Sequence, residues 1–233
     1  MLNNTRITLL SATLCVASLL AGCANQGSIE GINPTRGERV RDLSSNDSAR
    51  LAIATAQELE RVGSYAEAAV QYERAREYDP KQVQVSRNLA VLYDLTDRYS
   101  RSKDEYIKAL QLFPRDAELL NDYGYFNYRR GNLELSEQYL TKATEIDPFL
   151  DRAWMNLGVT LAEQGRYKES LLAFEQVRPE PEALQNLGTI MARQGLFDEA
   201  KEALEEALRL DPNLEEARRV LGSIAEYEER LGS

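Results

Sequence analysis

One stretch decides the fold of this chain: residues 154–174 read WMNLGVTLAEQGRYKESLLAF. On both sides of Gly165 the apolar residues recur every three or four positions, the spacing that places them on one face of an α-helix. Gly165 interrupts the pattern between the two halves. The stretch therefore predicts two amphipathic helices joined by a tight turn.

The prolines show that this unit is repeated. Pro80, Pro114 and Pro148 lie 34 residues apart, and Pro212 lies 64 residues beyond Pro148, which is one spacing of 34 and one of 30. A fixed period in this range is the sequence signature of a solenoid, in which each repeat packs against its neighbours. The chain is therefore expected to be a stack of helix pairs.

The unit resembles the tetratricopeptide repeat, a 34-residue pair of antiparallel helices. The resemblance rests on Trp154, Leu157, Gly158, Tyr167 and Phe174, and it implies that Gly158 and a small residue on the second helix let the two helices approach closely. Most columns agree in several repeats. The small residues are Ala68, Ser102, Ser136, Ser170 and Ala200; the turn residues are Gly63, Gly131, Gly165 and Gly195, with Asp97 as the exception; the large residues beside Phe174 are Tyr72, Tyr106, Leu140 and Leu204; and an alanine recurs as Ala75, Ala109, Ala143 and Ala207.

The resemblance implies an all-α fold, a right-handed superhelix of about five helix pairs with a C-terminal capping helix. In the fourth repeat the residues FEQVRPEPEA (174–183) predict a second helix that is one turn shorter and is stopped by Pro179 and Pro181, which would leave a notch. The predicted organisation is a signal peptide at 1–22, an acylated cysteine and flexible tether at 23–47, repeats over 48–212 (about 49–82, 83–116, 117–150, 151–180 and 181–214), and a cap at 215–233.

The N-terminal segment predicts export. An apolar run from Ile7 to Leu20 follows a short polar lead and is too short to span a bilayer comfortably. The ending Leu20-Ala21-Gly22-Cys23 resembles the lipobox of bacterial lipoproteins, which implies that Cys23 is acylated and becomes the first residue. In that family the residue after the cysteine influences sorting, and Ala24 is not the aspartate associated with inner-membrane retention. The resemblance therefore implies an outer-membrane anchor facing the periplasm, if the organism has two membranes. The alternative is an ordinary secretory signal that contains a cysteine by chance.

Composition narrows the classes of function. The 38 acidic residues exceed the 28 basic ones, so phosphate backbones are repelled on average and nucleic acid is not an expected partner. The chain has no histidine, which removes the commonest catalytic base and metal ligand. It also shows no phosphate-binding loop or nucleophile motif. We therefore expect no enzyme, no cofactor and no metal.

In the tetratricopeptide family the first helix of each repeat lines a concave groove that holds ligands. An α-helix rotates by 100° per residue, which predicts the side of each first helix that faces this groove. Twelve residues are expected there: Arg87, Asn88, Asn121, Asp122, Tyr125, Tyr128, Arg129, Arg152, Asn156, Gln185, Asn186 and Arg193. Among them Asn88, Asp122, Asn156 and Asn186 occupy one equivalent position. Amides repeated in this way can bond to the main chain of a bound peptide, or they can satisfy polar groups between helices; both interpretations stay open.

The aromatic cluster in residues 121–132, NDYGYFNYRRGN, divides under the same geometry. Tyr123 and Gly124 fall at packing positions, whereas Tyr125, Tyr128 and Arg129 are left for recognition. Such a groove suits a peptide with apolar and acidic side chains.

The architecture resembles lipoproteins of tight-adherence pilus assembly and the type IV pilus pilotins. This implies an adaptor that binds a protein or peptide segment of an envelope assembly such as a pilus or secretin. The alternative is an adaptor for peptidoglycan hydrolases or proteases. The partner's identity and the oligomeric state stay open.

Overall fold

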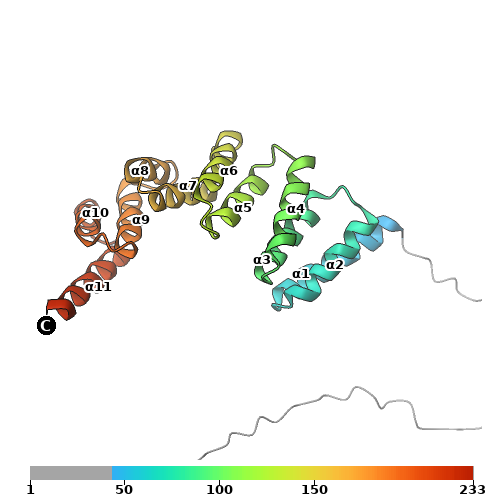
Figure 1. Cartoon of the computed structure of the whole chain (residues 1–233), viewed down its shortest axis with the longest axis horizontal. Helices are drawn as coiled ribbons and strands as arrows, with labels where there is room; N and C mark the ends of the chain where they lie inside the picture. The colour runs from blue at the N-terminus through green and yellow to red at the C-terminus, as the bar shows by residue number, and fades with distance from the viewer. Residues whose placement is uncertain (1–43, 233) are drawn as a thin grey trace, which may run out of the picture. The chain divides into compact units, whose positions relative to one another are not determined.

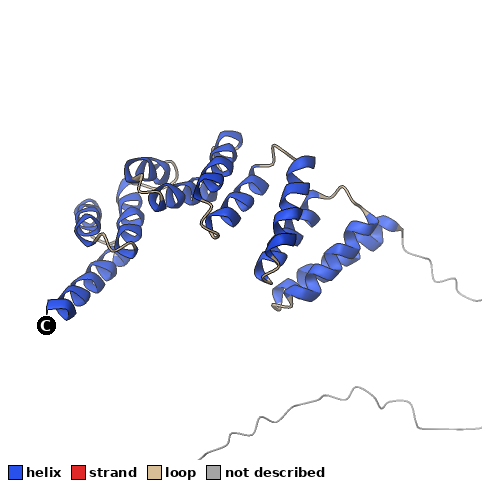
Figure 2. Ribbon diagram, viewed as in Figure 1, coloured by secondary structure: helices blue, strands red, loops and turns tan. Residues whose placement is uncertain are grey.

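The structure, a computed structural model, describes residues 44–232. The predicted signal peptide, the acylation of Cys23 and all but the end of the tether lie outside these residues. The described part is built of α-helices and contains no strand (Figures 1 and 2). The helices are α1 Ser45–Arg61, α2 Tyr65–Tyr78, α3 Val83–Leu95, α4 Tyr99–Leu112, α5 Ala117–Tyr128, α6 Leu133–Ile146, α7 Asp151–Glu163, α8 Tyr167–Glu175, α9 Glu180–Arg193, α10 Phe197–Leu210 and α11 Glu215–Gly232.

Consecutive helices pack as hairpins, α1 with α2 through α9 with α10, and each hairpin packs on the next (Figure 1). From α3 onward, each odd-numbered helix also contacts the next odd-numbered helix. The first helices of the repeats therefore lie next to one another and share one surface, which we call the odd-helix face. The all-helical solenoid expected from the sequence is confirmed.

Four glycines close the hairpins in the conformation that the repeat pattern predicts. Gly63, Gly131, Gly165 and Gly195 have φ angles between 72° and 81°, in the left-handed region where a side chain is strained. Asp97, the predicted exception, adopts the same conformation with φ of 60°. The turn therefore keeps its geometry in the second repeat although the glycine is missing.

A second set of glycines sets the spacing within hairpins. A Cβ atom on Gly158 would lie 2.5 Å from the ring of Phe174, and one on Gly124 would lie 2.6 Å from Leu140. The small residues opposite, Ser136 and Ser170 among them, are completely buried. Ser170 also donates a 2.7 Å hydrogen bond to the carbonyl oxygen of Gly158. Close approach of the two helices therefore explains both small residues, as the resemblance implied.

The fourth repeat confirms one prediction and corrects another. Helix α8 has 9 residues whereas α2, α4, α6 and α10 have 14 each, so the predicted shortening is present. The prolines do not stop it, however, because α8 already ends at Glu175. Pro179 is instead the N-cap of α9 and Pro181 lies in its first turn, where the missing N–H of proline is not needed.

Helices α1 and α11 form the two ends of the described stack. Helix α1 begins at Ser45, earlier than the tether end predicted at residue 47, because the Ser44 hydroxyl accepts a 3.1 Å hydrogen bond from the Asp47 amide as an N-cap. At the other end, α11 is one 18-residue helix, as predicted for the cap. Among the helices of residues 44–232, none is both long enough and apolar enough to cross a bilayer.

Candidate functional site

Tyr125 and Tyr128 form a partly exposed aromatic pair on α5. Their rings stack with centroids 6.0 Å apart, and Tyr125 is 44% exposed. Burial raises the pKa of the half-buried Tyr128, and the carboxylate of Glu163 on α7 acts in the same direction. Tyr123, by contrast, is buried against Tyr106 and Tyr139. The division of the cluster into core and surface tyrosines agrees with the geometry expected from the sequence.

An ion-pair network joins the odd-helix face across three repeats. The guanidinium of Arg87 on α3 pairs with Asp122, at 2.5 Å, and with Glu118, both on α5. Arg152 on α7 reaches the same Glu118 at 3.1 Å. The Arg87 side chain is only 14% exposed, so this predicted groove residue mainly connects repeats.

The predicted amide residues also bond within the protein. Asn88 on α3 donates a 2.6 Å hydrogen bond to the Tyr72 hydroxyl, and Asn156 on α7 donates a 2.9 Å hydrogen bond to Asn121 on α5. Asn121 itself is 3% exposed, which corrects its expected place on the groove surface. It is covered because α7 packs over that side of α5. These contacts are those expected if the amides satisfy polar groups between helices.

The other predicted residues keep more exposure. Arg129 pairs with Asp94 at 2.9 Å, and Arg193 pairs with Glu163 at 2.9 Å; both arginine side chains are about half exposed. Gln185 and Asn186 lie half-buried on α9. The acidic partners were not paired with the arginines from sequence alone, although Asp94 precedes Arg129 by about one repeat, as Glu163 precedes Arg193. This spacing of opposite charges is the signal that could have revealed the pairs.

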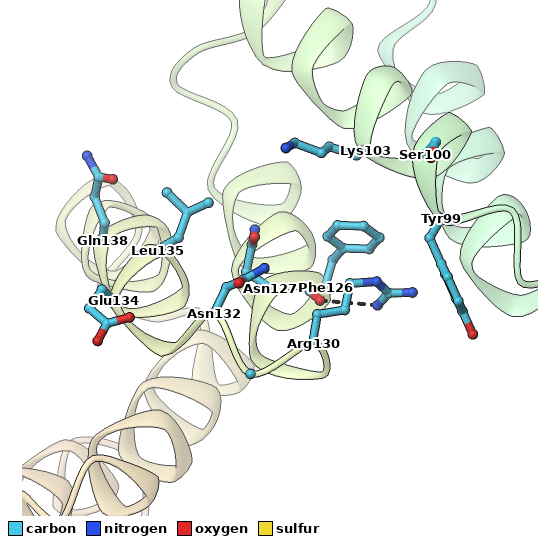
Figure 3. Close-up of a pocket in the computed structure, with 11 residues that line it drawn as sticks. Tyr99, Ser100, Lys103, Phe126, Asn127, Arg130, Asn132, Glu134, Leu135 and Gln138 are labelled. Atoms are coloured by element: carbon cyan, nitrogen blue, oxygen red, sulfur yellow. Dashed lines mark hydrogen bonds between the residues drawn. The ribbon is translucent and has the colours of Figure 1, made fainter.

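A cleft of about 630 Å³ lies on another side of the third repeat, between the starts of α4 and α6 (Figure 3). The Arg130 guanidinium lies 4.1 Å from the ring centre of Tyr99 and 4.0 Å from that of Phe126, and it also pairs with Asp94. Cation–π contacts of this kind hold an arginine in place. The sequence did not predict this cleft, because its wall combines two repeats.

Within residues 44–232, no group of three or more Cys, Asp and Glu side chains is arranged to hold a metal ion. What the odd-helix face offers is an aromatic pair, half-exposed guanidinium groups and half-buried amides. Such groups recognise protein or peptide surfaces.

Stacked helix pairs that present one shared face define a helical-repeat solenoid. Profiles of the tetratricopeptide repeat match residues 53–102, 150–183 and 181–214, and a profile of the YpiA-like C-terminal tetratricopeptide repeats matches residues 84–149. Together these matches run along all five helix pairs. The chain belongs to the tetratricopeptide-repeat proteins.

A curated relative and two solved structures refine the comparison. The type IV pilus assembly protein PilF of Pseudomonas aeruginosa is 28% identical over 159 residues, which are 67% of this chain and 60% of that protein. The solved structure of Pseudomonas aeruginosa pilF is 22% identical with a TM-score of 0.58, covering 81% of this chain and 94% of that one. YrrB, described as a tetratricopeptide protein with an unusual peptide-binding site, is 24% identical with a TM-score of 0.56, covering 73% of this chain and 90% of its own. The two structural likenesses concern the fold.

Proposed function

We propose that this protein is a lipid-anchored adaptor that binds a segment of a protein partner on its odd-helix face and assists the assembly of an envelope machine such as a pilus or secretin. The stacked, partly exposed Tyr125–Tyr128 pair is the observation that carries the proposal. Tyrosine supplies a large contact area at a low entropy cost and is enriched in the residues that dominate binding energy. A stacked pair with one ring 44% exposed is a prepared surface for a partner's apolar side chain.

Two arginines of the odd-helix face predict the charged part of the partner segment. Arg193 and Arg152 are about half exposed, and each holds one carboxylate of this chain. A guanidinium has five N–H donors, so each can donate hydrogen bonds to a further carboxylate from a partner. The bound segment is therefore expected to combine apolar and acidic side chains.

The envelope role is supported by the similarity to PilF, a type IV pilus assembly protein. This chain spans 60% of that relative's length, so the role is proposed here and not transferred. The anchor is proposed from the lipobox-like sequence that ends at Cys23. It would place the repeats at the outer membrane, on the periplasmic side.

Site-specific photo-crosslinking tests the binding face. A benzoylphenylalanine at position 125 should crosslink in native cell envelopes to a component of a pilus or secretin, identified by mass spectrometry. The matched control is position 65, because Tyr65 is similarly exposed but lies on α2, outside the odd-helix face. Tyr125→Ala should then weaken recovery of that component at least tenfold, whereas Tyr65→Ala should not. Crosslinks of equal yield at both positions contradict the proposed face, and a wall hydrolase as the product supports the alternative adaptor role.

The anchor is tested separately. Cys23→Ser should move the protein from the membrane fraction to the soluble periplasmic fraction, or leave it unprocessed, and should abolish incorporation of labelled palmitate. The protein with Cys15→Ser is the control, since Cys15 belongs to the predicted signal peptide. Palmitate labelling that persists in Cys23→Ser would rule out this anchor.

A further inference from the structure

A second cleft, about 960 Å³ in volume, lies along α10. Its floor is apolar and consists of Leu184 and Met191 from α9 with Ala203 from α10. Its rim is mainly acidic: Asp198, Glu199, Glu202, Glu205 and Glu206 lie on successive turns of α10, together with the two cations Lys201 and Arg209. We call it the α10 cleft.

The short α8 removes one contact that covers the equivalent position in the third repeat. In the third repeat, Leu120 occupies the position of Leu184 and is buried in a cluster against which Leu110, from the last turn of α4, packs. The residue of the fourth repeat that corresponds to Leu110 is Arg178, which lies beyond the end of α8 at Glu175. Leu184 lacks this contact, is half-buried and lines the cleft.

The charges on the rim are not balanced. Asp198 pairs with Lys201, and Glu206 pairs with Arg209. Glu199, Glu202 and Glu205 form no ion pair with any residue in the described part of the chain. They follow one another at three-residue spacing, and like charges at this spacing on a helix repel one another. A cationic partner would relieve this repulsion.

We propose that the α10 cleft binds a short amphipathic helix of a partner protein, with Lys or Arg along one edge and Leu, Ile or Phe on the adjoining face. The apolar side chains would pack on Leu184 as Leu110 packs against the cluster of Leu120 in the third repeat. The cations would lie over Glu199, Glu202 and Glu205. The α10 cleft is separate from the Tyr125–Tyr128 pair on the odd-helix face. This proposal can therefore be correct or wrong independently of the function proposed above.

The probe is a fluorescein-labelled 14-residue peptide that repeats Leu-Lys-Lys-Leu-Leu-Lys-Leu twice, titrated with the full chain at low salt and followed by fluorescence anisotropy with protein-free blanks. The cleft variant is Glu199→Gln, Glu202→Gln and Glu205→Gln together. The matched control is Glu77→Gln, Glu226→Gln and Glu229→Gln, three exposed residues outside the cleft that change the net charge equally. The cleft variant should bind at least tenfold more weakly, and the control should stay within twofold of the unmodified chain.

A second variant tests the floor. Leu184→Ser should weaken binding of the same peptide severalfold with no change in net charge, provided that circular dichroism shows an unchanged helix content. The labelled peptide with Glu in place of every Lys should not bind.

The proposal is overturned by equal weakening in the cleft and control variants, which means unspecific attraction to an acidic protein. It is also overturned by equal binding of the Glu peptide or by the absence of saturable binding. Self-association that the cleft variant abolishes would identify a second copy of this chain as the occupant and would also overturn it.

Discussion

At the scale of single residues, the glycines of this chain serve two purposes that the space around them distinguishes. Gly131 and the other turn glycines have open space where a Cβ would lie. Their positive φ angles would nevertheless strain any residue with a side chain. Gly158 and its equivalents have ordinary helical positions and no space. Gly222 of α11 has both a helical position and open space.

Gly158→Ala is expected to destabilise the protein by about 1–3 kcal/mol, because the new methyl group meets the Phe174 ring at 2.5 Å and forces α7 and α8 apart. Gly222→Ala is the matched control. It should stabilise the protein by up to about 1 kcal/mol, since alanine favours a helix more than glycine does. Urea unfolding measures both, and stabilisation by both substitutions would contradict the close-approach explanation.

At the turn positions, replacing glycine and introducing glycine should change the stability of the protein in opposite directions. Gly131→Ala places a side chain at φ of 72° and should cost about 1 kcal/mol. Asp97→Gly removes the side chain at φ of 60° and should stabilise the protein by a similar amount, reduced by the lost contact between Asp97 and the Tyr99 hydroxyl. Thermal unfolding of the two variants checks the signs. Destabilisation by Asp97→Gly would show that the side-chain contact outweighs the backbone strain.

The repeat columns could be predicted at this scale because each is fixed by a contact within one hairpin, as between Gly158 and Phe174. The burial of Asn121 could not be predicted from the sequence. The helical turn of 100° per residue places its side chain on the correct sector of α5, but whether that sector is covered depends on how closely α7 packs. The sequence period contains no information on that distance.

At the scale of elements, the repeats are joined by polar contacts as well as by apolar packing. Arg87→Met keeps the aliphatic stem but leaves Asp122, which is largely buried, without its cation. Hydrogen bonds to charged groups contribute about 1.5–3 kcal/mol, so we expect a loss of that order. Arg61→Met is the control, because both side chains of its ion pair with Glu58 are exposed and solvent screens their attraction, so the loss should be much smaller. Equal losses in urea unfolding would show that the buried network does not stabilise the stack.

The contact between α2 and α3 predicts an alkaline transition. Burial, followed by the hydrogen bond to Glu73, raises the pKa of Tyr93 to about 12, from an ordinary value near 10. The folded state therefore holds the phenol proton more tightly than the unfolded state does. The stability from this proton is fully present below pH of about 10 and is lost as the pH rises toward 12. Tyr93→Phe should reduce the fall in unfolding free energy between these two pH values, and an unchanged pH dependence would contradict the assignment.

Helix α8 shows what an element-scale prediction can and cannot reach. The missing four residues in the proline spacing predicted a shorter helix, and the structure has one. The same pattern did not show which helix Pro179 and Pro181 belong to, because a proline is equally compatible with the end of one helix and the first turn of the next. The contact that Leu184 lacks because this turn is missing could be found only from the three-dimensional structure.

At the scale of the whole described stack, the core is divided into successive clusters, each shared by neighbouring helices. One cluster joins α1, α2 and α3, and another, around Phe174 and Leu204, joins α7 to α11. No cluster of the described residues connects α1 with α7. Stability in such a stack is close to a sum of repeat terms and nearest-neighbour terms.

This division predicts how damage spreads along the stack. Gly158→Ala strains the hairpin of α7 and α8, so hydrogen exchange should accelerate in these helices and in α5, α6 and α9, which pack directly on them. Protection of α1 and α2 should be unchanged, because two repeats separate them from the strained hairpin. Hydrogen–deuterium exchange read by mass spectrometry resolves these segments in a single experiment. A uniform loss of protection from α1 to α11 would mean that the repeats unfold as one cooperative unit, and coupling between neighbours would then have to exceed the stability of any single repeat.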